Sequence, residues 1–323
     1  MHIDEFSERL NSLAAARVPF FFMVDFEMQQ PEILPLHEVD PSQILYEVNG
    51  RTNAASDISP TGELKLVKTP ISKDVYDARF RMVYDHLSYG DSYLTNLTIK
   101  TEVVMPATLR ELYFASHARY KLWYRDTFLV FSPEIFVQIE NGEIRSYPMK
   151  GTIDASIPGA AEIILSDEKE LAEHVTIVDL IRNDLSRVAN QVTVERFRYL
   201  EKITSADREL LQVSSAIRGT VAPSYLHRPG DLLVALLPAG SVSGAPKKKT
   251  TQIIAESEGE PRGYYSGVFG IWDNEQLDSG VMIRFIERQG DKYYYRSGGG
   301  ITARSTMDKE YQEAIDKIYV PVS

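Results

Sequence analysis

The chain has 323 residues, 43% of them hydrophobic and 25% charged, which is ordinary for a soluble globular protein. Its net charge of −11 argues against a nucleic-acid partner, because such partners select a basic surface. Cysteine is absent, which excludes disulfides and thiol chemistry. No apolar run approaches the roughly 20 residues of a membrane helix, and the amino terminus lacks the apolar core of a signal peptide. We therefore expect a cytoplasmic protein without a membrane partner.

The first part of the chain predicts a mixture of helices and strands. Its pattern indicates a short amphipathic helix over residues 1–17 and a buried strand over residues 20–24. Apolar residues at helical spacing predict a helix over residues 73–89, with Gly90 as its C-cap. Further strands are expected at residues 44–46, 93–105, 122–124 and 127–131.

A β-hairpin is the next predicted element, over residues 136–147. Asn141 and Gly142 separate two alternating runs and favour a type I′ turn, in which both central residues take positive φ. Lys150 lies just past this hairpin and is followed by Gly151. An ordered lysine beside a glycine suits a covalent nucleophile or an anion clamp. An exposed lysine at a strand end is the alternative.

The second half of the chain adds one long helix and several strands. The helix is predicted over residues 167–188, with one apolar face made of Leu171, Val175, Val178, Ile181, Leu185 and Val188. Strands are expected at residues 264–272, 280–286 and 292–296, and a closing helix at about residues 308–319. Because strands come in groups with helices between the groups, we expect a single α+β domain.

Two pairs of glutamates are candidate metal ligands. Glu170 and Glu173 are three residues apart on one predicted helix, and so are Glu310 and Glu313 on another. Carboxylates at this spacing share a helix face and repel each other mildly. A divalent cation between two such faces would turn the repulsion into ligation, and Mg²⁺ prefers a few carboxylates with water and substrate oxygens. Two solvated acidic faces are the alternative.

Glycine-rich segments and one arginine are candidate anion contacts. Residues 238–247 could direct backbone N–H groups and Lys247 at an anion. The glycines from Gly298 to Gly300 follow a strand directly, which suggests close approach to a ligand. Arg284 lies on an otherwise apolar strand face and needs a carboxylate partner, either from a substrate or from a structural salt bridge. Ordinary loops are the alternative for the glycine segments.

Taken together, these motifs resemble the chorismate-utilising enzymes, and they come in that family's order. The matching segments are residues 131–134, 148–152, 172–187, 240–247, 263–270, 283–284 and 298–301. They lie within a core from about residue 73 to 317, so residues 1–72 form a short N-terminal portion of one catalytic domain over residues 1–323. The resemblance implies an α+β fold of two facing, largely antiparallel sheets, with helices packed outside and the active site between the halves.

Two positions select a branch of this family. Lys150 resembles the aminodeoxychorismate synthases, component I, since anthranilate synthases usually have alanine there. Isochorismate and salicylate synthases carry a water-activating lysine where this chain has Leu94. The implied reaction converts chorismate and ammonia to 4-amino-4-deoxychorismate, for para-aminobenzoate and folate synthesis. Lys150 would attack C2 with loss of the C4 hydroxyl, and ammonia would then add at C4 and expel the lysine.

The resemblance also implies roles for the other site residues. Glu134 would be the general acid or base for the leaving hydroxyl. Mg²⁺ would be held by Glu173 and Glu313, with Glu170 and Glu310 close behind. The implied chorismate contacts are Gly151, Thr152, Ser241, Tyr265, Arg284, Gly298, Gly299 and Gly300.

The remaining expectations concern the source of ammonia and the alternatives. Because the chain has no cysteine to hydrolyse glutamine, a separate glutamine amidotransferase subunit should supply ammonia, and free ammonia should otherwise serve. Gln212 stands where the family usually has a histidine, and glutamine cannot shuttle a proton near neutral pH. Gln212 therefore supports a non-catalytic chorismate-binding homologue as one alternative, and anthranilate synthase component I is the enzymatic alternative.

Overall fold

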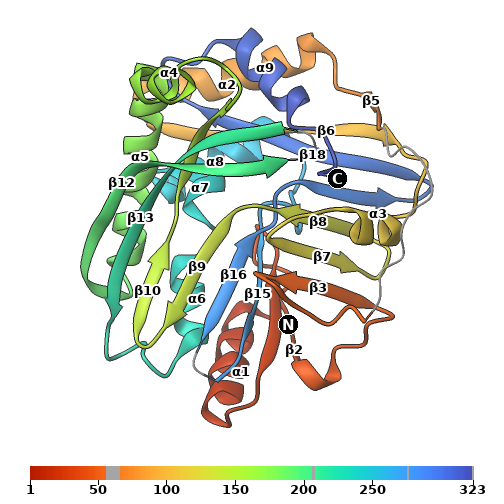
Figure 1. The fold of residues 1–323 in the computed structure, drawn as a ribbon, viewed down its shortest axis with the longest axis vertical. Helices are drawn as coiled ribbons and strands as arrows, with labels where there is room; N and C mark the ends of the chain where they lie inside the picture. Colours follow the sequence, from red (N-terminus) through yellow and green to blue (C-terminus); the bar gives the residue numbers. More distant parts are fainter. Residues whose placement is uncertain (56–65, 206–207, 275, 322–323) are drawn as a thin grey trace. The chain divides into compact units, whose positions relative to one another are not determined.

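The computed structural model describes residues 1–55, 66–205, 208–274 and 276–321 (Figure 1). The chain divides into two compact units, each assembled from three separate segments. The first unit comprises Met1–Val39, Glu134–Ser241 and Arg262–Val281, and the second comprises Asp40–Pro133, Val242–Pro261 and Met282–Ser323. That the whole chain acts as one chorismate-binding catalytic domain stays a prediction.

The first unit is built on a nine-stranded antiparallel sheet. The strand order is β11-β13-β10-β9-β16-β15-β1-β2, with β12 paired to β13. These strands are β1 (Phe20–Val24), β2 (Glu32–Pro35), β9 (Ile135–Glu140), β10 (Glu143–Ser146), β11 (Met149–Asp154), β12 (Ala189–Ser205), β13 (Arg208–Val221), β15 (Val268–Trp272) and β16 (Leu277–Val281).

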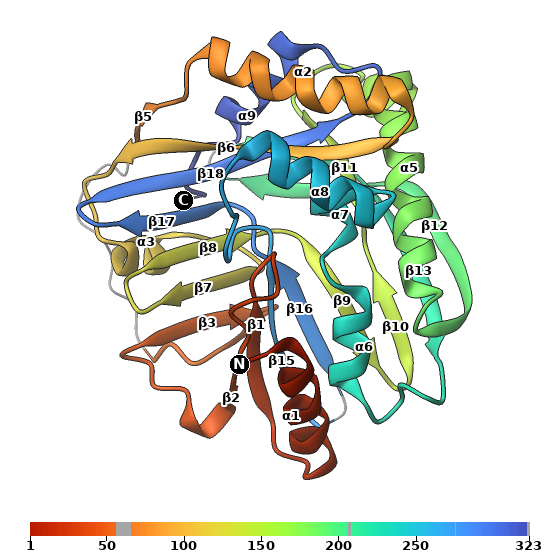
Figure 2. The ribbon, with the colours of Figure 1, turned by 180° about the vertical axis from the view of Figure 1, so that it is seen from behind.

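Helices cover one face of this sheet. Figure 2 shows α1, α5 and α6 on the side of the sheet that faces away from the viewer in Figure 1. The helices of this unit are α1 (Ile3–Ala15), a 3-10 turn at Leu36–Glu38, α4 (Ala160–Ser166), α5 (Glu168–Leu185) and α6 (Pro229–Leu236), and the short α7 (Gly240–Ser243) begins in it. Asp231 of α6 fixes α1 by accepting hydrogen bonds from Ser7 Oγ (2.7 Å) and Asn11 Nδ2 (2.8 Å).

The second unit has its own nine-stranded antiparallel sheet. The strand order is β14-β6-β18-β17-β8-β7-β3-β4, with β5 paired to β6. The strands are β3 (Ile44–Val48), β4 (Arg51–Thr52), β5 (Val67–Thr69), β6 (Leu94–Val104), β7 (Tyr120–Tyr124), β8 (Phe128–Ser132), β14 (Gly244–Ala245), β17 (Phe285–Gln289) and β18 (Lys292–Ile301). The helices are α2 (Lys73–Tyr89), α3 (Leu109–Ala115), α8 (Lys247–Glu258) and α9 (Met307–Asp316).

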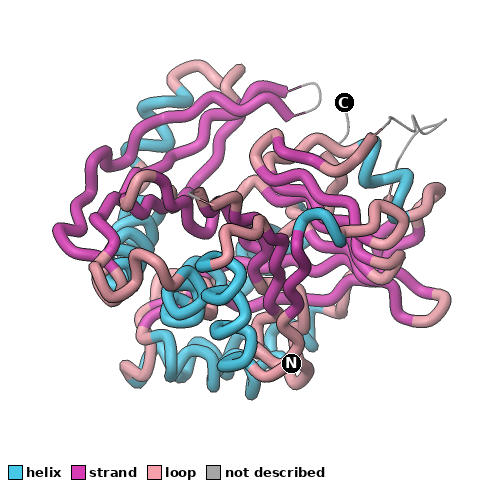
Figure 3. The backbone as a smooth tube through the Cα atoms, turned by 90° about the horizontal axis from the view of Figure 1, so that it is seen from below, coloured by secondary structure: helices cyan, strands magenta, loops and turns pink. Residues whose placement is uncertain are grey.

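Three of these helices share one apolar core with the sheet. Tyr76 and Phe80 of α2, Ile253 of α8 and Ala314 of α9 pack with Leu97 of β6. Burying each of the larger side chains contributes about 1.5–3 kcal/mol, so this cluster anchors α9 to the strands that carry the glycine motif. Figure 3 shows helices and strands together throughout the described chain, which confirms the predicted α+β class with largely antiparallel sheets.

Several local predictions are confirmed. Helix α2 begins after Ser72, whose side chain accepts from Val75 N, and ends at Gly90 in the left-handed conformation (φ 93°). Asn141 and Gly142 both have positive φ (51° and 76°), as a type I′ turn requires. No helix in the described part of the chain is long and apolar enough to cross a membrane.

Other local predictions are wrong, each for a physical reason. The strand expected at residues 264–272 begins only at residue 268, because the chain turns over residues 264–267. The strand expected at residues 280–286 is interrupted after Val281, where the chain leaves the first unit for the second. On α5, Leu171 and Val175 are exposed, because Glu173 and His174 occupy the buried face of the first turns.

Candidate active site

Lys150 lies within strand β11 and not in a turn after the hairpin. A register shift between Met149 and Thr152 against β13 creates a bulge at this point, and Gly151 adopts φ +81° within it. Bulges redirect side chains, and here Lys150 Nζ lies 3.7 Å from Glu173 Oε2 on α5. Gly151 is required for a second reason, since a Cβ there would lie 3.0 Å from Glu170 Oε2. The bulge therefore brings Lys150 and both glutamates of α5 together.

Glu173 is a buried carboxylate with an incompletely satisfied oxygen. Its side chain is 8% exposed, and Oε1 has no hydrogen-bond partner in the described chain, although Lys169 Nζ lies 3.6 Å away. A buried carboxylate oxygen without a hydrogen bond is costly unless a cation or another donor reaches it. Glu173 therefore fits the predicted role of a magnesium ligand. No group of three or more acidic or histidine side chains within the described residues is arranged to hold a metal, so the four-glutamate magnesium site stays a prediction.

The second predicted glutamate pair lies on α9, beside the glycines of β18. A Cβ on Gly299 would lie 3.3 Å from Glu313 Oε1 and 3.7 Å from Glu310 Oε2. The glycines are thus inside a strand, where they let the α9 carboxylates approach the backbone. Lys317, which sequence reasoning missed, joins the two elements by donating to Glu313 Oε1 (2.6 Å) and to Gly298 O (2.9 Å).

Tyr76 is a further residue near these carboxylates that the sequence did not single out. Burial raises the pKa of the Tyr76 phenol well above its usual range, and the charges of Glu310 and Glu313 act in the same direction. Its place in the buried stripe of α2 is the sequence signal of a core aromatic residue, so nothing local distinguished it. Its ring packs on Tyr311 with centroids 5.2 Å apart.

Arg284 occupies the break between β16 and β17 and not the middle of a strand. Its φ of 53° is uncommon for a residue with a side chain and marks a constrained backbone. The guanidinium lies over the ring of Tyr319, 4.9 Å from its centroid, and Nη1 is 3.4 Å from Lys317 O. No ion pair joins Arg284 to a carboxylate among the described residues. The expected role as a carboxylate contact of chorismate stays a prediction.

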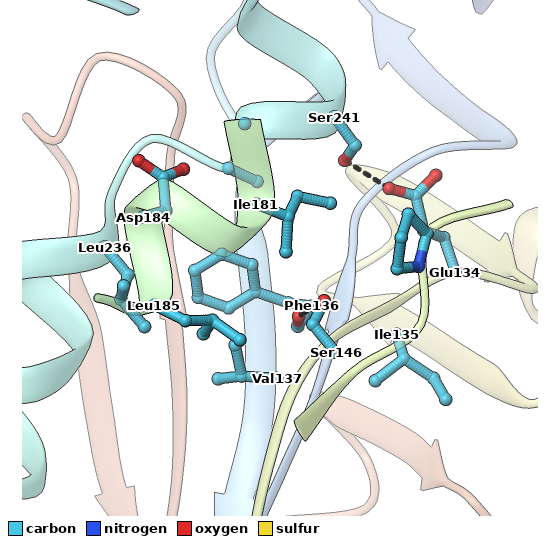
Figure 4. Close-up of a pocket in the computed structure, with 13 residues that line it drawn as sticks. Glu134, Ile135, Phe136, Val137, Ser146, Ile181, Asp184, Leu185, Leu236 and Ser241 are labelled. Carbon is cyan, nitrogen blue, oxygen red and sulfur yellow. Dashed lines mark hydrogen bonds between the residues drawn. The ribbon is translucent and has the colours of Figure 1, made fainter. Parts of the chain in front are cut away.

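Glu134 lies between β8 and β9, at the start of the second segment of the first unit. Its backbone oxygen accepts from Val281 N (3.1 Å), and its Oε1 accepts a short hydrogen bond from Ser241 Oγ at α7 (Figure 4). Both side chains line a cavity of about 20 Å³ inside the first unit. That volume holds about one water molecule.

His174 is a buried titratable group that the sequence reasoning did not use. It has no exposed surface, and its Nε2 lies 2.6 Å from Ser215 Oγ. Ser215 N in turn donates to Pro148 O (3.0 Å), two residues before Lys150. Burial, followed by the positive charges of Arg198 and Lys150, lowers the pKa of His174 to about 4, so the ring is neutral near pH 7. In the sequence, the one feature that pointed to His174 was its position directly after Glu173, a predicted metal ligand.

The remaining predicted positions are placed as follows. Thr152 is paired with Gln212 across β11 and β13, so the residue that replaces the family histidine belongs to the same strand pair as Lys150. Tyr265 is buried in the turn before β15. Leu94 is buried at the start of β6. Their roles toward chorismate stay predictions.

Several known proteins are similar to this chain in sequence. The sequence pattern of the family described as chorismate binding enzyme matches residues 21–323. A PabA-like protein of Pasteurella multocida (strain Pm70) is 49% identical over 323 residues, with 100% of both chains covered. Aminodeoxychorismate synthase component 1 of Salmonella typhimurium is 29% identical over 324 residues, covering 96% of this chain and 69% of that protein.

A solved structure extends the comparison to the fold. Anthranilate synthase component I of Streptococcus pneumoniae superimposes with a TM-score of 0.67 at 28% identity, covering 81% of this chain and 60% of that chain. The likeness thus holds for the sequence pattern over most of the chain and for the arrangement of its strands and helices. The chain belongs to the family of chorismate binding enzymes.

Proposed function

We propose that this chain is the synthase component of an aminodeoxychorismate synthase, which converts chorismate and ammonia to 4-amino-4-deoxychorismate and water. The observation that carries the proposal is Lys150, held in a bulge of β11 with its amine 3.7 Å from the buried Glu173. The similarity to the Salmonella component over 96% of the chain supports the same branch.

The proposed chemistry uses Lys150 as a nucleophile and Glu134 as an acid and base. The Lys150 amine forms a bond to C2 of chorismate, the ring double bond shifts, and the C4 hydroxyl departs as water with a proton from Glu134. Ammonia then forms a bond at C4, the double bond shifts back, and the C2–N bond to Lys150 breaks. Fixing the lysine in a partly buried strand reduces its conformational freedom, which favours attack.

Magnesium dependence is part of the proposal. The buried Oε1 of Glu173, without a hydrogen-bond partner in the described chain, supports Glu173 as a ligand, and Glu170, Glu310 and Glu313 complete the proposed set. When bound, the ion would hold the ring carboxylate of the substrate and offset its charge. Binding of Mg²⁺ is measurable by calorimetry without substrate, and Glu173→Gln should weaken it.

Ammonia is proposed to come from a separate glutamine amidotransferase, because the chain contains no cysteine. The PabA-like name of the Pasteurella relative supports such an association. The product would feed para-aminobenzoate and folate synthesis. Free ammonium should replace the partner in a purified assay.

The test follows the substrate-derived products and the protein mass together. Purified protein is incubated with chorismate and Mg²⁺, with or without ammonium, and an aminodeoxychorismate lyase is added to release 4-aminobenzoate. With ammonium, 4-aminobenzoate should appear. Without it, intact-protein mass spectrometry should show an adduct of chorismate minus water on Lys150.

The matched control is the neighbouring lysine of α5. Lys169 Nζ lies 3.6 Å from Glu173, close to the Lys150 distance, but Lys169 has no proposed chemistry. Lys150→Ala should abolish both the adduct and amination, while Lys169→Ala should keep both. Equal activity of the Lys150→Ala variant would remove Lys150 from the mechanism, and anthranilate as the sole product would replace the proposed reaction.

A further inference from the structure

The hydrogen bond between Ser241 and Glu134 changes the role expected for Ser241. The sequence resemblance implies that Ser241 contacts chorismate. In the structure its hydroxyl donates to Oε1 of Glu134, which lies 107 residues away in the chain (Figure 4). A hydroxyl has a single proton to donate, so the Ser241 proton used for Glu134 is not available to a substrate oxygen.

We propose that Ser241 is a positioning residue that orients the Glu134 carboxyl group and stabilises the carboxylate that Glu134 becomes when it gives its proton to the leaving hydroxyl. The proposal rests on the proposed function, in which Glu134 handles the proton of the leaving hydroxyl. A hydroxyl donor stabilises a carboxylate more than a carboxylic acid, and it restricts rotation of the carboxyl group. Ser241 therefore favours one orientation of Glu134 and stabilises the carboxylate formed when its proton is transferred.

The surroundings of Ser241 show how the chain fixes its hydroxyl. The preceding residue, Gly240, lies so close to α5 that a Cβ would be 2.9 Å from Asp184 Oδ2 and 3.2 Å from Leu180 Cγ. This contact seats the start of α7 against α5 and leaves little freedom to the next residue. On the other side, Val281 N holds the backbone oxygen of Glu134 at 3.1 Å. The backbone positions of Ser241 and Glu134 are thus each fixed by contacts other than the hydrogen bond between them.

The cavity beside the pair supplies a matched control. Ser146 lines the same 20 Å³ cavity, but its hydroxyl donates to Phe136 O (3.0 Å) and not to Glu134. Ser146→Ala therefore removes a hydroxyl of the same size from the same cavity without touching the carboxylate. Ser241→Thr keeps a hydroxyl at the position of Ser241.

The first measurement titrates Glu134 directly. The protein is labelled with ¹³Cδ-glutamate, and the Glu134 signal is identified by its loss in Glu134→Gln. In Ser241→Ala the titration midpoint of this carboxyl should move to higher pH, and in Ser241→Thr and Ser146→Ala it should stay at the wild-type value. An unchanged midpoint in Ser241→Ala, or an equal shift in Ser146→Ala, overturns the proposal. This readout needs no turnover, so it stands or falls separately from the proposed reaction.

The second measurement separates positioning from substrate binding. If Ser241 positions Glu134, Ser241→Ala should lower kcat for amination on the order of tenfold to a hundredfold with little change in KM, as expected for losing a hydrogen bond to a charged group. The limb of the pH–rate profile on which activity falls as Glu134 loses its proton should move in the same direction as the NMR midpoint, and Ser241→Thr should restore both. A rise in KM with unchanged kcat would overturn the proposal and return Ser241 to the role of a chorismate contact.

Discussion

Replacing His174 with glutamine should remove a defined part of the pH dependence of stability. His174 is fully buried and hydrogen-bonded to Ser215. Its burial, followed by the positive charges of Arg198 and Lys150, lowers its pKa to about 4 in the folded protein. In the unfolded chain the value is 6.5. Above the unfolded value neither state binds a proton, and the folded protein keeps its full stability. As the pH falls below 6.5, His174 of the unfolded chain binds a proton. In the folded protein His174 stays neutral until the pH approaches about 4, so the folded state loses stability relative to the unfolded state.

The size of this effect follows from the two values. Between pH 7 and pH 5, proton binding to the unfolded chain alone should lower the free energy of unfolding by about 2 kcal/mol, at 1.36 kcal/mol per pKa unit. The loss continues toward the folded pKa and then levels off. The glutamine in His174→Gln can still hydrogen-bond to Ser215, but it does not bind a proton in this pH range. Its stability at pH 7 should be lower, while its further loss down to pH 5 should be about 2 kcal/mol smaller than that of wild type.

Urea denaturation of both proteins at several pH values, in buffer with a chelator so that no cation binds Glu173, measures the difference. Titrating carboxylates elsewhere contribute equally to both proteins and cancel. His37→Gln, at an exposed histidine, should keep the wild-type pH dependence. If His174→Gln fails to fold, NMR of the wild-type imidazole should still show a neutral ring at pH 5. A parallel loss of stability in wild type and variant, or a charged ring at that pH, refutes the reasoning.

Four further substitutions test the packing and the metal site. Gly299→Ala should weaken Mg²⁺ binding by about tenfold in calorimetry, because its methyl group would lie 3.3 Å from Glu313 Oε1. The circular dichroism spectrum should stay unchanged. Unchanged Mg²⁺ affinity would show that β18 does not contribute to the metal site. Gly270→Ala should reduce the free energy of unfolding by about 3 kcal/mol or more, since its Cβ would meet Asp278 O at 2.3 Å. Gly290→Ala, in open space at φ +61°, should cost only about 1 kcal/mol, and equal losses at both positions would contradict the steric argument. Glu173→Gln should weaken Mg²⁺ binding, and unchanged affinity would exclude Glu173 as a ligand.

The sequence predicted those elements whose signals are local. Helix α2 was bounded by a capping serine and a C-cap glycine, and the Asn141-Gly142 turn required positive φ at both residues. The broken strand near Arg284 could not be predicted, because apolar residues continue through the point where the chain changes units. The long β12–β13 pair was missed because its polar residues obscure a period of two.

The site was predictable in its residue types but not in its pairings. The glycines, glutamates and Lys150 were recognisable as a set through their resemblance to a family. The contacts of Lys150 with Glu173 and of Ser241 with Glu134 join residues far apart in the chain, and no local pattern encodes them. Lys317 and His174 were missed because a lysine and a histidine on amphipathic helices resemble ordinary surface and core residues.

The most direct test of the central claim is mass-spectrometric identification of the product formed from chorismate, Mg²⁺ and ¹⁵N-ammonium. The proposed function predicts 4-amino-4-deoxychorismate carrying ¹⁵N at C4 with wild-type protein and with Lys169→Ala, and none with Lys150→Ala. Labelled anthranilate with pyruvate, or undiminished 4-amino-4-deoxychorismate from Lys150→Ala, would contradict it.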